Sequence, residues 1–315
     1  MIELVQIENS KINEYKEIWE KSPNSIVFND FEWLKLVCQS NEKVFLYGIY
    51  DNGILIGGFP LIKLNSRFMN YYSNTSLTPY TGIFLLEKYN SAPKKREVLE
   101  SFIEFIEKLS LDNFHFFFSP YEKDFLPFKR SNYNILLNLT YKIDLLKDVN
   151  KIYQSLRNDK KRNIKAAEKE LISVSFEKNS NLIIDLVKKT YSRQNKSINW
   201  ISSAEELLNN YQNYFQVTSF IGDKPAASLC IVYDKSRAYY LFGGFNDALN
   251  NYNAGPYAMW NAILKAKALN KKVFDFEGSE IYTIEKYFQS FGGEQELYFS
   301  INVKSKKQRF LNFIK

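Results

Sequence analysis

The stretch VFDFEGSEIYTIEKYFQSFGGE, residues 273–294, combines a strand pattern, a helix pattern and two neighbouring acids. Its first residues alternate aromatic and acidic side chains, which predicts a strand because successive strand side chains point to opposite faces. Phe274 and Phe276 are then expected on one face, and Asp275 and Glu277 together on the other, about 6 to 7 Å apart. Folding alone gives no reason for this acid pair, so it indicates a functional site.

A short helix is predicted directly after this strand. Its apolar side chains recur at spacings of three, four and three residues and form one stripe: Ile281, Ile284, Phe288 and Phe291. Ser279 is expected to cap the start of the helix, and Gly292 with Gly293 supplies a left-handed stop. The polar side chains of the helix are Tyr282, Lys286 and Gln289.

Length and composition indicate an ordinary globular protein. With 315 residues, 45% of them apolar and 24% charged, the chain is long enough for about two domains with real cores. No run approaches the roughly 18 apolar residues of a membrane span. The acidic N-terminal segment lacks the layout of a signal peptide. We therefore expect a cytoplasmic protein without a transmembrane segment.

Cysteine and histidine are too scarce for a disulfide framework or a multi-histidine metal site. Cys38 and Cys230 lie in apolar contexts, which fits a reducing compartment. His115, the single histidine, lies in FHFFF and is interpreted as a core or interdomain residue rather than a base. We expect no metal.

Positive charge is concentrated in two segments of a chain whose net charge is +7. The segment RNDKKRNIK, residues 157–165, holds five basic residues and one acid. The tail VKSKKQRFLNFIK, residues 303–315, holds five basic residues and no acid. Such charge favours acidic partners, among them phosphates, nucleotides, tRNA and an anionic membrane surface.

The two halves of the chain repeat one order of elements. The first half is predicted to contain helices, the hairpin VFLYGIYDNGILIGGFPLIKL (residues 44–64), a helix and strands. The second half repeats this order with a hairpin at residues 214–246, a helix at residues 256–270 and the strand described above. We therefore expect two similar domains, residues 1–147 and 148–315.

Six stretches, in this order along the chain, resemble the tandem-GNAT family: VFNDFEWLKL, GGFPLIK, LTPYTGIFL, KRNIKAAEKE, DKPAASLCIVYDKSRAYYLFGGFND and FDFEGSEIYTIEKYFQSFGGE. This family contains the Fem-type aminoacyltransferases of peptidoglycan crossbridges and acyl-CoA-dependent enzymes of surface-polysaccharide synthesis. The resemblance covers most of the chain. It implies an α+β or α/β fold with two GNAT-like domains, each a mixed, mostly antiparallel sheet flanked by helices.

Two departures from the Fem-type pattern favour the acyl-CoA branch of this family. Fem-type enzymes that use charged tRNA often carry a long helical hairpin in the second domain, and no heptad stretch of that kind is present here. Their sequences also tend to have a lysine at the position that Phe288 occupies. The resemblance therefore implies an N-acyltransferase that acts on nucleotide-linked amino sugars.

The acid pair offers the groups that direct acyl transfer requires. An amine attacks a thioester only after a base has removed its proton, and the leaving thiolate needs a proton donor. A carboxylate beside aromatic rings and a second carboxylate has a raised pKa, which suits Glu277 or Asp275 as the base. Alternatively, one acid binds substrate or caps the helix while the other is solvated. Tyr282 is a candidate donor to the thiolate, with packing as the alternative.

Other segments carry candidate binding residues. Gly255 and Pro256 lie where the GNAT pyrophosphate loop would be, although tyrosines replace its other characteristic residues; a plain helix start is the alternative. Lys160 lies near the apolar side of a predicted helix, and Arg162 matches a family arginine. Both are expected to contact a diphosphate, unless they belong to a solvated helix face. The resemblance places Tyr80 at a cleft between domains, with a structural turn as the alternative.

The leading hypothesis is an N-acyltransferase that transfers an acyl group from acyl-CoA to the amine of a dTDP- or UDP-linked amino sugar by direct attack. Further candidates for substrate contact are Ser279, Lys286 and Gln289. The runner-up is a Fem-type transferase that uses aminoacyl-tRNA and a peptidoglycan precursor. A third hypothesis is a basic protein without enzymatic activity that binds nucleic acid or a membrane surface.

Overall fold

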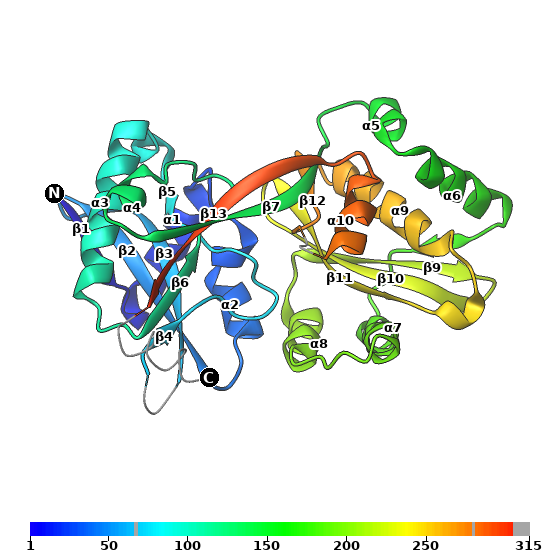
Figure 1. The fold of residues 1–315 in the computed structure, drawn as a ribbon, viewed down its shortest axis with the longest axis horizontal. Coiled ribbons are helices and arrows are strands. Elements are labelled where there is room, and N and C mark those ends of the chain that lie inside the picture. The colour runs from blue at the N-terminus through cyan, green and yellow to red at the C-terminus, as the bar shows by residue number, and fades with distance from the viewer. Residues whose placement is uncertain (66–68, 279–280, 305–315) are drawn as a thin grey trace. The chain divides into compact units, whose positions relative to one another are not determined.

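The computed structural model describes residues 1–65, 69–278 and 281–304 (Figure 1). The chain forms two compact units. Unit 1 comprises Met1–Asn138 and the chain from Leu297 onward, and unit 2 comprises Leu139–Glu296. The chain passes from one unit to the other inside strands β7 (Asn134–Asp144) and β13 (Glu294–Lys304). The chain enters unit 2 after Asn138 and returns to unit 1 after Glu296, whereas the sequence analysis predicts a single boundary between residues 147 and 148.

Unit 1 contains a mixed sheet with the strand order β1-β2-β3-β4-β6-β13. Its strands, besides those shared with unit 2, are β1 (Ile2–Gln6), β2 (Glu42–Asp51), β3 (Ile54–Leu64), β4 (Tyr71–Tyr72), β5 (Phe84–Leu85) and β6 (Asn113–Phe117). The β4–β6 pair is parallel, whereas β1–β2, β2–β3, β3–β4, β3–β5 and β6–β13 are antiparallel. Its helices are α1 (Ile12–Lys21), α2 (Phe31–Val37), α3 (Ala92–Lys108) and α4 (Leu126–Arg130).

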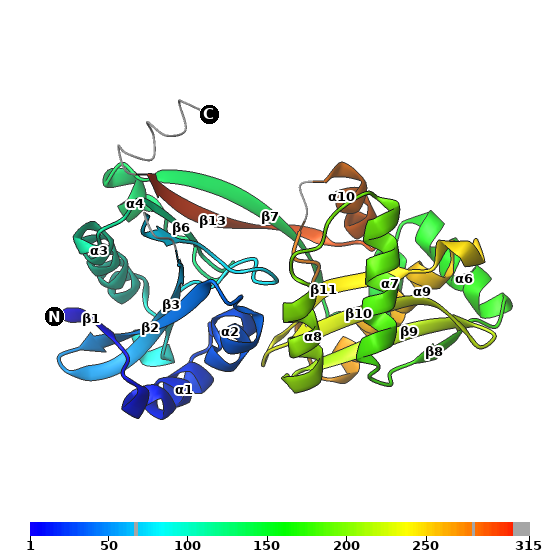
Figure 2. The same ribbon diagram turned by 90° about the horizontal axis from the view of Figure 1, so that it is seen from below.

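Unit 2 contains the strand order β7-β12-β11-β10-β9-β8. The further strands are β8 (Ser173–Ser175), β9 (Tyr214–Ile221), β10 (Lys224–Tyr233), β11 (Arg237–Phe245) and β12 (Val273–Asp275). The β11–β12 pair is parallel, whereas β7–β12, β8–β9, β9–β10 and β10–β11 are antiparallel. The helices are α5 (Val149–Ser155), α6 (Asn158–Lys169), α7 (Ser180–Arg193), α8 (Ile201–Asn210), α9 (Ala254–Ala268) and α10 (Tyr282–Gln289). Helices α7 and α8 cover one face of this sheet and α9 covers the other (Figures 1 and 2).

These two units confirm the expected fold of mixed, mostly antiparallel sheets flanked by helices. Turn chemistry in unit 1 also follows the sequence, because Asn52 and Gly53 adopt the left-handed φ values of +49° and +79° between β2 and β3. Within residues 1–65, 69–278 and 281–304, no helix is long and apolar enough to cross a membrane.

Phenylalanine side chains of β12, of the turn that follows it and of α10 form part of the core of unit 2. Phe274 and Phe276 are buried with ring centroids 5.2 Å apart, which confirms their expected inward orientation. Phe276 also stacks on Phe288 at 5.0 Å. The apolar stripe of α10 is nevertheless only half buried, because Ile281 and Ile284 are 48% and 38% exposed. Helix α10 therefore packs through its last turn, and its first turn faces outward.

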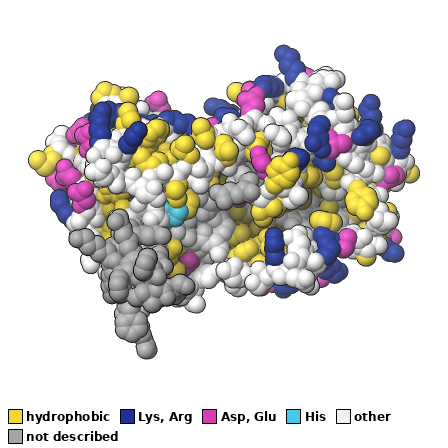
Figure 3. All heavy atoms as spheres, in the orientation of Figure 1, with side chains coloured by type: hydrophobic (Ala, Val, Ile, Leu, Met, Phe, Trp, Pro, Cys, Tyr) yellow, Lys and Arg dark blue, Asp and Glu magenta, His cyan; other side chains and the backbone are white. Residues whose placement is uncertain are grey.

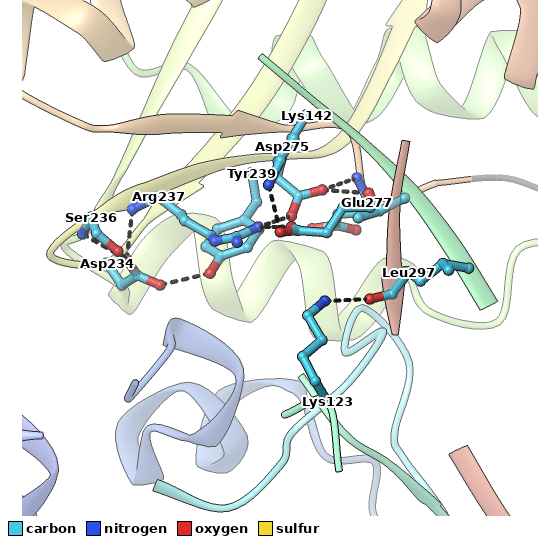
Figure 4. Close-up of polar contacts among 11 residues, drawn as sticks. Lys123, Lys142, Asp234, Ser236, Arg237, Tyr239, Asp275, Glu277 and Leu297 are labelled. Atoms are coloured by element: carbon cyan, nitrogen blue, oxygen red, sulfur yellow. Dashed lines mark hydrogen bonds and ion pairs between the residues drawn. The ribbon is translucent and has the colours of Figure 1, made fainter. Parts of the chain in front are cut away.

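A buried cluster of charged side chains joins the strands of unit 2 (Figure 4). The Arg237 Nη1 atom on β11 donates to Asp275 Oδ2 on β12 at 2.9 Å and to Glu296 Oε2 on β13 at 2.7 Å. Lys142 on β7 donates to the other oxygen of Glu296 at 2.6 Å. The side chains of Arg237 and Asp275 are only 5% and 0% exposed. One guanidinium thus neutralises carboxylates from two strands.

Glu296 remains ionised in this cluster because its cationic neighbours outweigh its burial. Burial alone would raise the pKa of Glu296, but hydrogen bonds and charge from Arg237 and then Lys142 bring the pKa below its ordinary value. Loss of the guanidinium would leave two covered carboxylates without their shared partner.

Replacing Arg237 with methionine is expected to lower the free energy of unfolding by about 3 to 5 kcal/mol, because a buried charge pair that loses one partner is strongly destabilised. Lys147→Met is the matched control, since the exposed Lys147–Glu294 pair in the same unit should contribute less than about 1 kcal/mol. Urea unfolding of both variants measures the difference. Equal losses would contradict a structural role for the buried cluster.

Candidate active site

Strands β11 and β12 part in the middle of the unit 2 sheet. Their parallel ladder contains three pairs, which run from Arg237 with Val273 to Tyr239 with Asp275. Strand β11 continues to Phe245, whereas the chain after β12 turns toward β7, where the Phe276 N–H donates to the Tyr141 carbonyl at 2.9 Å. Among the described residues, β11 beyond Tyr239 therefore has no ladder partner on its β12 side.

Glu277 leaves the strand in a left-handed backbone conformation. Its φ is +60°, and Gly278 follows at +71°. A Cβ atom at Gly278 would lie 2.0 Å from the Leu139 carbonyl oxygen, so only glycine fits that position. The expectation that Asp275 and Glu277 share one face of a strand is therefore wrong. Strand β12 ends at Asp275, and the backbone rotates before Glu277.

Asp275 holds this bend in place. Its carboxylate is fully buried, and Oδ1 accepts hydrogen bonds from the Thr140 hydroxyl and from the Glu277 N–H, the latter at 2.9 Å. Its other oxygen binds Arg237. Both carboxylate oxygens are thus engaged within the protein. These contacts give Asp275 a structural role in orienting Glu277.

The Glu277 carboxyl group lies in a desolvated environment. Its Oε1 atom is covered, and the described residues provide no hydrogen-bond partner for it. Burial, and secondarily the negative charge of Asp275, raise the pKa of Glu277 well above its ordinary value. A covered carboxyl oxygen without a partner is uncommon in folded proteins, and a perturbed acid of this kind is typical of functional sites.

Two other ionisable groups surround this carboxyl. Burial raises the pKa of Cys230 on β10, and the charge of Glu277 raises it further. Burial also raises the pKa of Tyr240 on β11, with additional contributions from Tyr191, Glu277 and Cys230. Tyr240 is the first residue of β11 beyond the ladder with β12, and its ring meets Phe288 edge-on at 5.9 Å. Glu277 is therefore placed at the point where the two strands part.

Residues of α10 lie at the surface beside this point. Tyr282 is 63% exposed, and the Lys286 ammonium lies 4.2 Å from the centroid of its ring. Gln289 is exposed on the last turn of the helix. Gly292 has a φ of +76°, which confirms the left-handed stop. Ser279 lies outside the described residues, and the residue that precedes α10 is Ile281.

Among the basic residues of α6, Lys160 is largely buried, whereas Arg162 and Lys165 are exposed. The Lys160 side chain is only 12% exposed and lies 3.5 Å from Asp159. Its ammonium lies 5.1 Å from the centroid of the Tyr287 ring, which confirms its expected position near the apolar side of the helix. Arg162 is exposed. Lysine and arginine side chains gather over α5 and α6 on the face shown in Figure 3.

The remaining sequence candidates have no contact with Glu277 among those described for them. Gly255 is the second residue of α9, and a Cβ atom there would meet nothing within 4 Å. Tyr80 belongs to unit 1 and is fully buried between Phe28 and Tyr298, so its ring has no open surface. His115 is also in unit 1, with Nε2 3.0 Å from the Ser300 hydroxyl. No group of three or more potential metal ligands occurs in the described part of the chain.

Sequence reasoning missed Arg237, Thr140 and Tyr240. Arg237 follows the turn DKS, and strand alternation alone would have placed it on the face opposite Ala238. A lone arginine at a buried strand position is a signal for an acidic partner, but its partner Asp275 is 38 residues away. Thr140 and Tyr240 carry no comparable signal, because an isolated strand threonine and one of 22 tyrosines do not stand out in the sequence.

Comparisons with known proteins agree with this architecture. Residues 211–288, which include Glu277, match the family model of the acetyltransferase (GNAT) domain. No curated protein sequence matches the chain. The chain is similar in structure to FemX, with 12% identity, a TM-score of 0.73 and coverage of 99% of this chain and 100% of that one.

Two further solved structures have similar folds. One is a tandem GNAT protein from the clavulanic acid biosynthesis pathway, with 7% identity, 96% and 98% coverage of this chain and that one, and a TM-score of 0.56. The other is a conserved protein of unknown function from Bacteroides thetaiotaomicron, with 14% identity, 96% and 99% coverage and a TM-score of 0.59. At these identities the likeness is one of fold. Together with the domain match, it assigns the chain a GNAT-like fold and the class of an acyltransferase.

Proposed function

We propose that the protein is a cytoplasmic N-acyltransferase that moves an acyl group from acyl-CoA to the amine of a dTDP- or UDP-linked amino sugar. The observation that supports this proposal is the desolvated Glu277 carboxyl at the point where β11 and β12 part. An acyltransferase that acts on amines needs a base, and a carboxyl with a raised pKa meets that need.

The reaction proceeds by direct attack in this proposal. The Glu277 carboxylate accepts a proton from the substrate ammonium, and the freed nitrogen lone pair attacks the acyl carbonyl carbon. The C–N bond forms and the C–S bond breaks. The thiolate takes a proton from a donor, and the second proton that the nitrogen loses on becoming an amide restores that donor. Tyr282, exposed on the first turn of α10, is the proposed donor of that proton. Asp275 is a positioning residue, because its contacts with the Glu277 N–H and Arg237 fix the bend that carries the base.

The donor would lie along β11. Beyond Tyr239 this strand has no ladder partner on its β12 side, among the residues that the structure describes. An extended chain with amide groups can bind such an edge as an additional strand. Pantetheine contains two amides separated by short aliphatic segments, so this part of acyl-CoA fits the edge and would bring the thioester toward Glu277.

The acceptor's diphosphate would be bound at α6. Lys160 and Arg162 lie on the first two turns of this helix, where positive charge and the helix start both favour an anion. Lys286 and Gln289 on α10 are proposed to contact the sugar part. A nucleotide-linked amino sugar presents the diphosphate and the amine within one molecule, which suits a basic helix and a buried base in the same unit.

The second candidate is a Fem-type transfer from aminoacyl-tRNA to a peptidoglycan precursor. The observation that favours it is the similarity of fold to FemX over nearly the full length of both chains. Transfer of a labelled amino acid from charged tRNA to such a precursor would distinguish this reaction from thioester chemistry.

The proposed activity is tested with purified protein, a panel of acyl-CoA donors and a panel of dTDP- and UDP-linked amino sugars. We expect release of free thiol, together with an acylated nucleotide sugar in the mass spectrum, for at least one pair. Complete absence of thiol release across both panels would count against the proposal.

Glu277→Gln is expected to lower kcat by about 10² to 10⁴, the range for loss of a general base. The wild-type rate should rise with pH through the raised pKa of Glu277, because only the ionised carboxylate accepts a proton. The variant should lack this rise. Glu294→Gln, which changes an exposed carboxyl on β13, is the control and should keep the wild-type profile. A wild-type profile in the Glu277 variant would rule out this base.

The protonation of Glu277 also predicts a pH-dependent stability difference. Because its pKa is raised in the folded protein, its stabilising contribution is present below its ordinary pKa of 4.5 and is lost as the pH rises through the folded value. Glu277→Gln should therefore melt near the wild-type temperature at about pH 4 and above it at about pH 8. Thermal unfolding at both pH values measures this difference. An equal difference at the two pH values would mean that the carboxyl has an ordinary pKa.

Lys160→Met is expected to raise KM for the nucleotide-linked sugar by about tenfold or more while kcat changes little, because a charge-assisted contact with the diphosphate is lost. Lys165→Met changes an exposed lysine of the same helix and should leave KM within about twofold of wild type. Steady-state kinetics with the sugar varied provide both values. Equal effects of the two changes would argue for general charge attraction rather than a site at Lys160.

A further inference from the structure

The start of α9 carries its own cap. The Asn251 side-chain oxygen accepts hydrogen bonds from the Asn253 N–H at 2.8 Å and the Ala254 N–H at 3.1 Å. Asn250, one residue earlier, has a left-handed φ of +47° that brings the chain into this turn. The capping side chain thus occupies the position at which a helix start otherwise accepts an anion.

Few peptide donors remain at this helix start. Pro256 has no N–H group, and the Tyr257 N–H already donates to the Asn253 carbonyl at 3.0 Å. Of the N–H groups of residues 253–257, the contacts among the described residues leave only that of Gly255 for a ligand. Diphosphate cradles at helix starts use several convergent N–H groups. This turn therefore lacks the donors that such a cradle requires.

A carboxylate also lies against the same turn. Glu170, directly after α6, accepts hydrogen bonds through its two oxygens from the side-chain amides of Asn251 at 2.8 Å and Asn253 at 2.9 Å. Asn163 on α6 donates to the Asn253 side-chain oxygen at 2.8 Å. These contacts fix the capping turn, and they place a negative charge where a diphosphate would have to approach. Repulsion between the carboxylate and a diphosphate opposes binding there.

We infer that the first turn of α9 does not bind the diphosphate of the acyl donor, and that donor recognition depends on the acyl and pantetheine part alone. This inference rests on the proposed function and deepens it by defining the donor class as acyl thioesters with or without a nucleotide. It also reverses the role that the sequence suggested for Gly255. The open space around Gly255 does not form an anion site, because the Glu170 carboxylate nearby repels an anion and most of the adjacent N–H groups are already hydrogen-bonded.

The first arm of the test compares donors. An acyl-pantetheine and the matching acyl-CoA are used with the same amino-sugar acceptor, and kcat/KM is measured for each. We expect the two values to agree within about threefold. A preference for acyl-CoA of about 100-fold or more would overturn the inference, because it would require substantial binding of the nucleotide diphosphate.

The second arm measures CoA binding by calorimetry and does not depend on turnover. Gly255→Asp adds a negative charge at the start of α9, and Gly255→Asn is the neutral control of the same size. Both variants should fold, because a Cβ atom at Gly255 meets nothing within 4 Å. The Kd for CoA should be the same within about twofold in both variants. A Kd about tenfold weaker in Gly255→Asp would place the diphosphate at this turn and overturn the inference.

The two arms separate this inference from the proposed function. Similar kcat/KM values for the two donors, together with an unchanged Kd for CoA in Gly255→Asp, support both the inference and the proposed function. Absence of CoA binding to the wild-type protein and to both variants supports a closed α9 start while it contradicts acyl-CoA as the donor. Tight CoA binding that Gly255→Asp weakens supports the proposed donor and overturns the inference.

Discussion

The ion pair between Arg237 and Asp275 is the interaction on which the candidate site depends. Both side chains are almost fully buried, and a charge in such a position is tolerated only when it is paired and hydrogen-bonded. Arg237 holds one Asp275 oxygen, so the other is directed at Thr140 and at the Glu277 N–H. The end of β12 and the direction of the following residue are thereby fixed. Removal of the pair would change the position of Glu277 as well as the stability of the sheet.

The separation of β11 and β12 places the constrained Glu277 carboxyl where a substrate could reach it. A continuous sheet would bury its peptide groups in the ladder, whereas here, among the described residues, β11 has no ladder partner on its β12 side beyond Tyr239, and Glu277 lies where the two strands part. Tyr240 and Cys230 surround the carboxyl, and burial raises the pKa of each of them. The site is therefore a set of neutral, poorly solvated groups around one acid. Such surroundings favour proton uptake by Glu277 from a cationic amine and disfavour a permanent charge.

The sequence predicted local structure well where local signals determine it. The alternation in VFDF placed Phe274 and Phe276 in the core, and the glycine at residue 292 ended α10 as expected. The sequence-based prediction failed where contacts with residues distant in sequence determine the backbone conformation. Glu277 leaves the strand because Asp275 binds Arg237 and Thr140, which lie 38 and 135 residues away in sequence, and no local pattern contains that information. The first turn of α10 is exposed although its spacing is that of a buried stripe. The return of β13 to unit 1 likewise depends on pairing with β6.

The protonation of Glu277 is the central claim, and a carbon-13 NMR titration of its side-chain carboxyl tests it directly. Selective glutamate labelling, with Glu277→Gln used to assign the resonance, follows this group without any substrate. The account predicts a midpoint well above the ordinary pKa of 4.5 for glutamate. A midpoint at the ordinary value would show that the carboxyl is solvated in solution, and the assignment of Glu277 as the buried base would then be wrong.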